Sequence, residues 1–101
     1  MAARGRDRYE TRAAQELKAL TDRLDQMRAV VERVSEERRF TLERALDDLR
    51  GLRNRCEAKL EDVRRASEDS WDLVKVHADA ALAQFKGGLE RIEGQFHRIA
   101  A

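Results

Sequence analysis

Residues 17–34 read LKALTDRLDQMRAVVERV, and their larger apolar side chains recur at alternating steps of three and four. The positions are Leu17, Leu20, Leu24, Met27, Val31 and Val34. Because an α-helix turns once every 3.6 residues, this spacing places all of these side chains in one stripe along a helix. The stretch therefore predicts a helix whose apolar stripe packs like the a and d positions of a coiled coil.

The apolar stripe continues along the chain after one change of register. Its next members are Leu42, Leu46, Leu49, Cys56, Leu60 and Val63. The step from Val31 to Leu42 is eleven residues, which a continuous helix accommodates by unwinding the supercoil locally. Arg38 and Arg53 stand at stripe positions, where polar residues fix register at a cost in stability. We therefore expect the helix to continue through residues 35–41.

The last third of the chain carries a wider apolar face. Its stripe consists of Trp71, Val74, Phe85, Leu89, Ile92 and Phe96. Further apolar side chains lie beside that stripe at Leu73, Val76, Ala80 and Leu82. A face of this width needs more than one partner helix, or it leaves apolar surface in water.

Three sites carry signals for a turn. Gly51 opens a stretch with the spacing of a glycine C-cap followed by a capping box. Residues 67–70, SEDS, provide serine caps and acidic groups suited to the start of a new helix. Gly87 and Gly88 weaken a helix at adjacent positions. Each site is also compatible with a continuing helix, so one very long helix and two or three shorter ones both remain open.

The composition is typical of long helices and not of an enzyme. Of the 101 residues, 41% are charged, 5% are aromatic and none is proline, which leaves little material for the walls of a pocket. The 21 basic and 20 acidic residues give a net charge of +1, so bulk electrostatics provides no reason to expect nucleic-acid binding. No apolar run approaches the ~20 residues that a membrane span requires.

The first residues and the single cysteine bear on the cellular location. The basic start of the chain is not followed by an apolar run, so we identify no secretory signal and expect a cytoplasmic protein. Cys56 is the only cysteine, which excludes a disulfide within the chain. We interpret it as a small buried apolar residue. The alternative is a position near the two-fold axis of an antiparallel homodimer, where two copies could form a disulfide.

The histidines do not form a metal-binding pattern. His77 and His97 lie far apart, and only Glu93 stands at helical spacing from His97. A zinc site requires three or four protein ligands in fixed geometry. We therefore predict no metal site, no cofactor and no catalytic residue.

One run of the sequence is more distinctive than the periodicity. Residues 66–75 read ASEDSWDLVK. With Tyr9, Leu60 and Arg64, this run resembles a family of small bacterial coiled-coil proteins known as stress-response proteins, over about residues 9–92. The resemblance implies an all-helical, cytoplasmic, non-enzymatic protein with a role in stress. The chain departs from the family at His77, where its members often carry a small residue.

Together these patterns predict an all-α protein of long amphipathic helices, arranged as a coiled coil or a helical hairpin. We divide it into a basic flexible tail at residues 1–8, a coiled-coil helical region at residues 9–66 and an amphipathic helical region at residues 67–101. The division follows the charge of the first residues, the narrow stripe of the middle and the wider face of the last third.

The apolar stripes also predict how the protein acts. Four or five heptads of leucine and valine are not stable in water without a partner, so we interpret the stripe from Leu17 to Val63 as a self-association seam. A homodimer is favoured, with the C-terminal face free to dock another helix. The alternative hypothesis is a protein that reversibly coats lipid or hydrophobic granule surfaces with residues 71–99.

Overall fold

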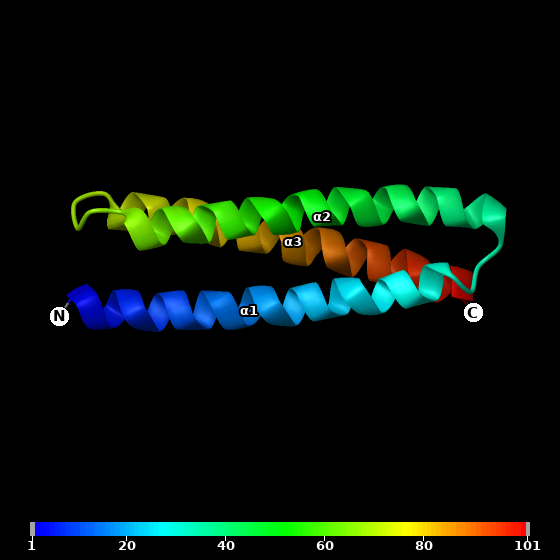
Figure 1. Ribbon diagram of the computed structural model, residues 1–101, viewed down its shortest axis with the longest axis horizontal. Helices are drawn as coiled ribbons and strands as arrows, with labels where there is room; N and C mark the ends of the chain where they lie inside the picture. The colour runs from blue at the N-terminus through cyan, green and yellow to red at the C-terminus, as the bar shows by residue number, and fades with distance from the viewer. Residues whose placement is uncertain (1, 101) are drawn as a thin grey trace.

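Three helices of equal length account for nearly the whole chain (Figure 1). The computed structural model describes the backbone of residues 2–100 and the side chains of residues 5–98. Its elements are α1 (Ala2–Val31), α2 (Glu36–Arg65) and α3 (Trp71–Ala100). No strand occurs in the described range. The all-α fold predicted from the sequence is therefore confirmed.

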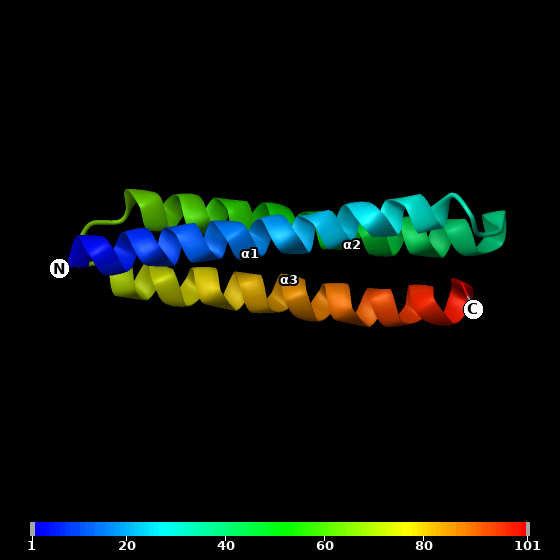
Figure 2. The ribbon, with the colours of Figure 1, turned by 90° about the horizontal axis from the view of Figure 1, so that it is seen from below.

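The helices lie side by side along one axis (Figures 1 and 2). α1 and α3 point the same way, and α2 runs antiparallel to both. Each helix contacts the other two, and the bundle measures 53 × 17 × 16 Å. Because 30 residues of α-helix extend about 45 Å, each helix spans most of the long axis.

The first turn lies between α1 and α2, where we expected a continuing helix. The amide of Arg33 donates to the carbonyl of Val30 at 2.9 Å, which closes the end of α1. Ser35 has extended backbone angles, φ −62° and ψ 156°, and its carbonyl accepts from the amide of Arg39 at 2.9 Å. Glu36 and the next residue place acidic groups at the positive end of α2. The eleven-residue step in the apolar stripe is therefore a turn, not a stutter.

The second turn, between α2 and α3, falls at one of the three sites that carried turn signals. Ala66 ends α2 in an extended conformation, and the amide of Ser70 donates to the carbonyl of Ser67 at 3.2 Å. The hydroxyls of these serines lie 2.9 Å apart. The other two candidate sites, Gly51 and Gly87–Gly88, lie inside α2 and α3, where the helices continue.

The apolar stripes of the three helices meet in one core inside a single chain. Most of the residues that we assigned to a self-association seam are buried there: Leu20, Leu24, Met27, Val31, Leu42, Leu46, Leu49, Cys56, Leu60 and Val63. Leu17 and Val34 are partly buried against the same core. The two turns bring these stripes together, so the seam leaves water without a second chain. The C-terminal face also packs here: Phe85, Leu89 and Phe96 are buried, and Trp71, Val74 and Ile92 are partly buried.

The basic start of the chain is part of α1, which begins at Ala2. The basic tail that we expected at residues 1–8 therefore falls within α1, except for residue 1, which lies outside the described part. Arg6 extends from this first segment and donates to the carbonyl oxygens of Val63 at 2.6 Å and Arg64 at 3.0 Å. The last carbonyl groups of a helix lack hydrogen-bond partners within the helix, so the Arg6 guanidinium stabilises the end of α2. The same hydrogen bonds hold the first turns of α1 against α2.

Candidate functional site

A cluster of aromatic and charged side chains joins α1 to α3 near the second turn. The Tyr9 hydroxyl donates to Asp79 Oδ1 at 2.7 Å. The Tyr9 ring meets the Trp71 ring edge to face, with centroids 6.1 Å apart and planes at 86°. The Lys75 ammonium lies over both rings, 5.3 Å from the Tyr9 centroid and 5.4 Å from the Trp71 centroid. Aromatic pairs and cation–π contacts of this geometry stabilise a fold.

The contacts of this cluster hold α1 against α3. Burial raises the pKa of Tyr9, and the hydrogen bond to Asp79 raises it further, so the phenol stays protonated as a donor. Tyr9 itself is only 7% exposed, and its hydroxyl lies closer to Asp79 Oδ1, at 2.7 Å, than to the carbonyl oxygen of Lys75, at 3.4 Å. Tyr9, Trp71 and Lys75 all belong to the residues that carry the resemblance, and the fold brings the three together. Asp79 carries no such signal in the sequence, although it lies four residues after Lys75 and therefore on the same helix face.

At the opposite end of the bundle, α1 and α3 are joined by an ion pair. The Arg23 guanidinium donates to both carboxylate oxygens of Glu93, through Nε to Oε2 at 3.0 Å and through Nη2 to Oε1. This two-bond geometry fixes the register of the helices. Glu93 was the residue at helical spacing from His97, and its partner is Arg23.

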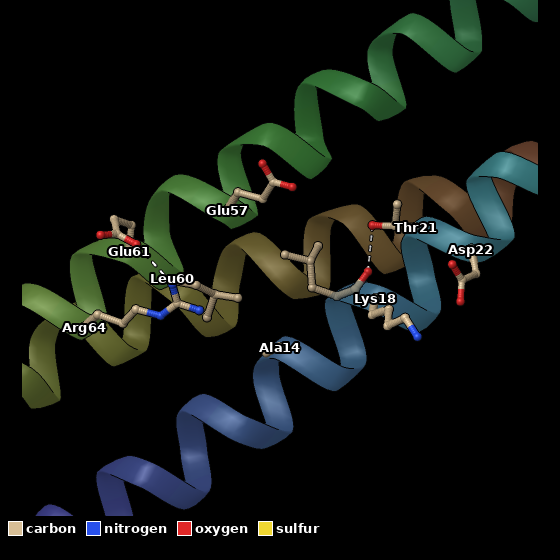
Figure 3. A pocket seen from close by; sticks show the side chains of 9 residues that line it. Ala14, Lys18, Thr21, Asp22, Glu57, Leu60, Glu61 and Arg64 are labelled. Carbon is tan, nitrogen blue, oxygen red and sulfur yellow. Dashed lines mark hydrogen bonds and ion pairs between the residues drawn. The ribbon is translucent and has the colours of Figure 1, made fainter.

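A shallow groove of about 480 Å³ runs between α1 and α2 (Figure 3). Its apolar lining consists of Ala14, Leu17 and Leu60, with α3 passing behind. Charged side chains of both signs line the rest: Lys18, Asp22, Glu57, Glu61 and Arg64. Arg64 Nη1 donates to Glu61 Oε2 at 3.3 Å across one turn of α2. The groove thus combines three acidic and two basic side chains and has no concentration of one charge that would select an anion or a cation.

Among the side chains of residues 5–98, those on the outward face of α3 form the most apolar exposed surface. Leu73 is 64% exposed and Val76 is 62% exposed, although both are large apolar side chains. Ala80 and Ala83 continue the exposed stripe toward Gly87. The outward faces of α1 and α2 instead carry charged residues on successive turns. Phe40 on α2 is 66% exposed, but it stands alone with the Arg44 guanidinium 6.0 Å from its ring centroid. The outward face of α3 is therefore the candidate functional site.

The remaining candidates from the sequence lie apart from this face or on its edge. His77 and His97 are exposed, and within the described residues no group of three His, Cys, Asp or Glu side chains is placed to hold a metal ion. Cys56 is fully buried in α2. None of the helices in the described range is long and apolar enough to cross a membrane.

Comparison with known proteins adds no further assignment. No protein family, curated protein or solved structure matches the chain.

Proposed function

We propose that this protein is a non-enzymatic structural and interaction protein, which acts by associating with a second copy of itself. The observation that carries the proposal is the outward face of α3, where Leu73 and Val76 are more than half exposed. Burying a side chain of this size removes about 1.5–3 kcal/mol of unfavourable exposure, so two of them on one face favour association. The buried seam of the same chain offers no such surface.

The alternative, a reversible coat on lipid or hydrophobic granules, requires a change of structure. It depends on Trp71, Phe85 and Phe96 entering an apolar phase. Phe85 is 0% exposed and Phe96 is 4% exposed, since both pack in the core. The bundle would have to open before these rings could reach a lipid surface, whereas self-association uses α3 as it stands.

The proposed cellular location and the link to stress come from the sequence alone. The resemblance of residues 66–75 and Tyr9 to stress-response proteins supports a cytoplasmic protein with a role in stress. A scaffold of this kind works through its surface, so its partners are a second copy of the chain and, beyond it, another helical protein. We propose no role in binding specific nucleic acids, because the net charge is +1.

Sedimentation velocity on the reduced, full-length protein tests the proposal. A concentration series reports mass and elongation together. We expect an elongated monomer at the lowest concentrations and a dimer at the highest, because one apolar face of moderate size supports a weak interface. A monomer at every concentration would refute self-association. Co-sedimentation with phospholipid vesicles separates the alternative: binding that Trp71→Ala abolishes, without a dimer, would favour the coat.

A further inference from the structure

The outward stripe of α3 is graded in size from one end to the other. Its members, spaced by three and four residues, are Leu73, Val76, Ala80, Ala83 and Gly87. The large side chains lie in the first half and the small ones in the second. Over these about four turns the stripe contains no charged residue. When two copies run in opposite directions, the large side chains of one copy no longer face those of the other, and the small residues of the two copies can pack closely.

Gly87 has no role inside the chain that would explain its lack of a side chain. A Cβ built at Gly87 meets nothing within 4 Å, whereas one at the neighbouring Gly88 lies 3.1 Å from Leu52 Cδ1 and 3.2 Å from Leu49 Cδ2. Gly88 therefore allows α3 to pack closely on α2. An exposed glycine inside a helix destabilises it relative to alanine. The open space at Gly87, beside the exposed apolar stripe, leaves room for a side chain of a second chain.

We propose that two copies of the protein associate through their α3 helices in antiparallel orientation, with the two-fold axis between Ala80 and Ala83. The inference rests on the self-association proposed above and specifies its surface. In this register Val76 of each copy packs over Gly87 of the other, and the alanines pack across the axis. Leu73 covers the aliphatic part of Glu90 of the second copy. The contact is isologous and closes at two copies.

Among the charges beside the stripe, the pair nearest the proposed axis favours the same orientation. Asp79 and Lys86 are seven residues apart and lie on the flank of α3 that faces α1, as the Tyr9–Asp79 bond shows for the first of them. When two helices run antiparallel, this flank faces its own counterpart, and Asp79 of each copy lies near Lys86 of the other. In a parallel pair Lys86 would instead lie near Arg91 of the second copy, and leucine would face leucine. Both effects oppose the parallel arrangement.

A matched pair of glycine substitutions tests the surface. Gly87→Leu fills the space that Val76 of the second copy would occupy, and Gly51→Leu makes the same change on the outward face of α2. A Cβ meets nothing within 4 Å at either position, so both sites have room for a side chain. Circular dichroism verifies that both variants fold. By sedimentation equilibrium we expect Gly87→Leu to raise the dimer dissociation constant at least ~10-fold and Gly51→Leu to leave it unchanged.

The outcomes separate this inference from the proposed function. If the wild type and Gly87→Leu have the same dimer dissociation constant, the α3 interface is wrong while self-association stands. A wild-type protein that stays monomeric would overturn both.

A charge reversal tests the orientation. Lys86→Glu places a carboxylate near Asp79 of the second copy in the antiparallel dimer, and near Arg91 in a parallel one. We expect the dissociation constant to rise several-fold at low ionic strength and the effect to shrink as salt is added. A dimer that is tighter than the wild type, or unchanged, would overturn the antiparallel orientation.

Discussion

Tyr9 fastens α1 to α3 by packing and by a hydrogen bond, and the two contributions are separable. Tyr9→Phe removes the 2.7 Å bond to Asp79 and keeps the ring against Trp71. We expect the free energy of unfolding to fall by about 1 kcal/mol, since water can solvate the freed carboxylate of the exposed Asp79. Urea denaturation measures the change. Tyr9→Ala, which also removes the ring, should cost about 3–5 kcal/mol. Equal stability of Tyr9→Phe and wild type would contradict the bond.

The same variant has a defined dependence on pH. The pKa of Tyr9 is raised above the ordinary value of 10.0, chiefly by burial and then by the bond to Asp79. Above pH 10 the unfolded tyrosine therefore ionises while the folded one stays protonated, so stability from this group decreases as pH rises. The stability difference between wild type and Tyr9→Phe should stay constant below pH 10 and shrink above it.

At the scale of the helices, two glycines in similar sequence settings have opposite roles. Gly51 in α2 faces open space, and Gly88 in α3 lies against the ends of Leu49 and Leu52. We expect Gly51→Ala to stabilise the fold by about 1 kcal/mol, the difference in helix propensity. Gly88→Ala should show no gain, or a loss, because its Cβ would press on leucine side chains at 3.1 and 3.2 Å. Thermal denaturation of the two variants checks this. A gain from both would indicate that α3 does not pack closely on α2.

The two turns show how far the sequence predicts these elements. The turn at residues 67–70 is visible as serines and acidic residues before an apolar run. The turn at Ser35 contains no glycine or proline, and its one signal is a serine followed by Glu36 and Glu37. The apolar spacing continues almost in phase across the gap and favours a continuing helix there. Periodicity identifies the stripe of each helix, but a step of eleven residues suits both a turn and a continuing helix.

At the scale of the molecule, the sequence predicts which residues leave water but not which chain covers them. The same a and d spacing suits a two-chain coiled coil and a three-helix bundle. It therefore predicts self-association for the stripe from Leu17 to Val63, which the chain buries internally. The wider face of the last third was visible in Leu73 and Val76. Only the fold shows that these two remain outside while Leu82 turns inward and is buried.

The three stripes share one core, so the bundle should unfold as a unit, and Cys56 reports on this directly. Its thiol is 0% exposed, and burial raises its pKa to about 11, so it reacts only when the chain opens. We expect labelling with a thiol reagent near pH 8 to be at least about 1,000-fold slower than in urea, as stability of a cooperative domain implies. The free energy of opening calculated from the ratio of the two labelling rates should equal the free energy of unfolding measured by urea denaturation.

A matched control places the thiol two residues away on the same helix. Ala58 is exposed, so Ala58→Cys in a Cys56→Ala background should react at the rate of an open thiol. The labelling rate of the exposed thiol at position 58 shows how fast a thiol on α2 reacts without cover. The slower rate of Cys56 then measures the protection that packing against α1 and α3 provides. Rapid labelling of Cys56 under conditions where circular dichroism shows an intact fold would mean that α2 leaves the bundle by itself. The association through α3 would then act on a hairpin and not on a closed three-helix unit.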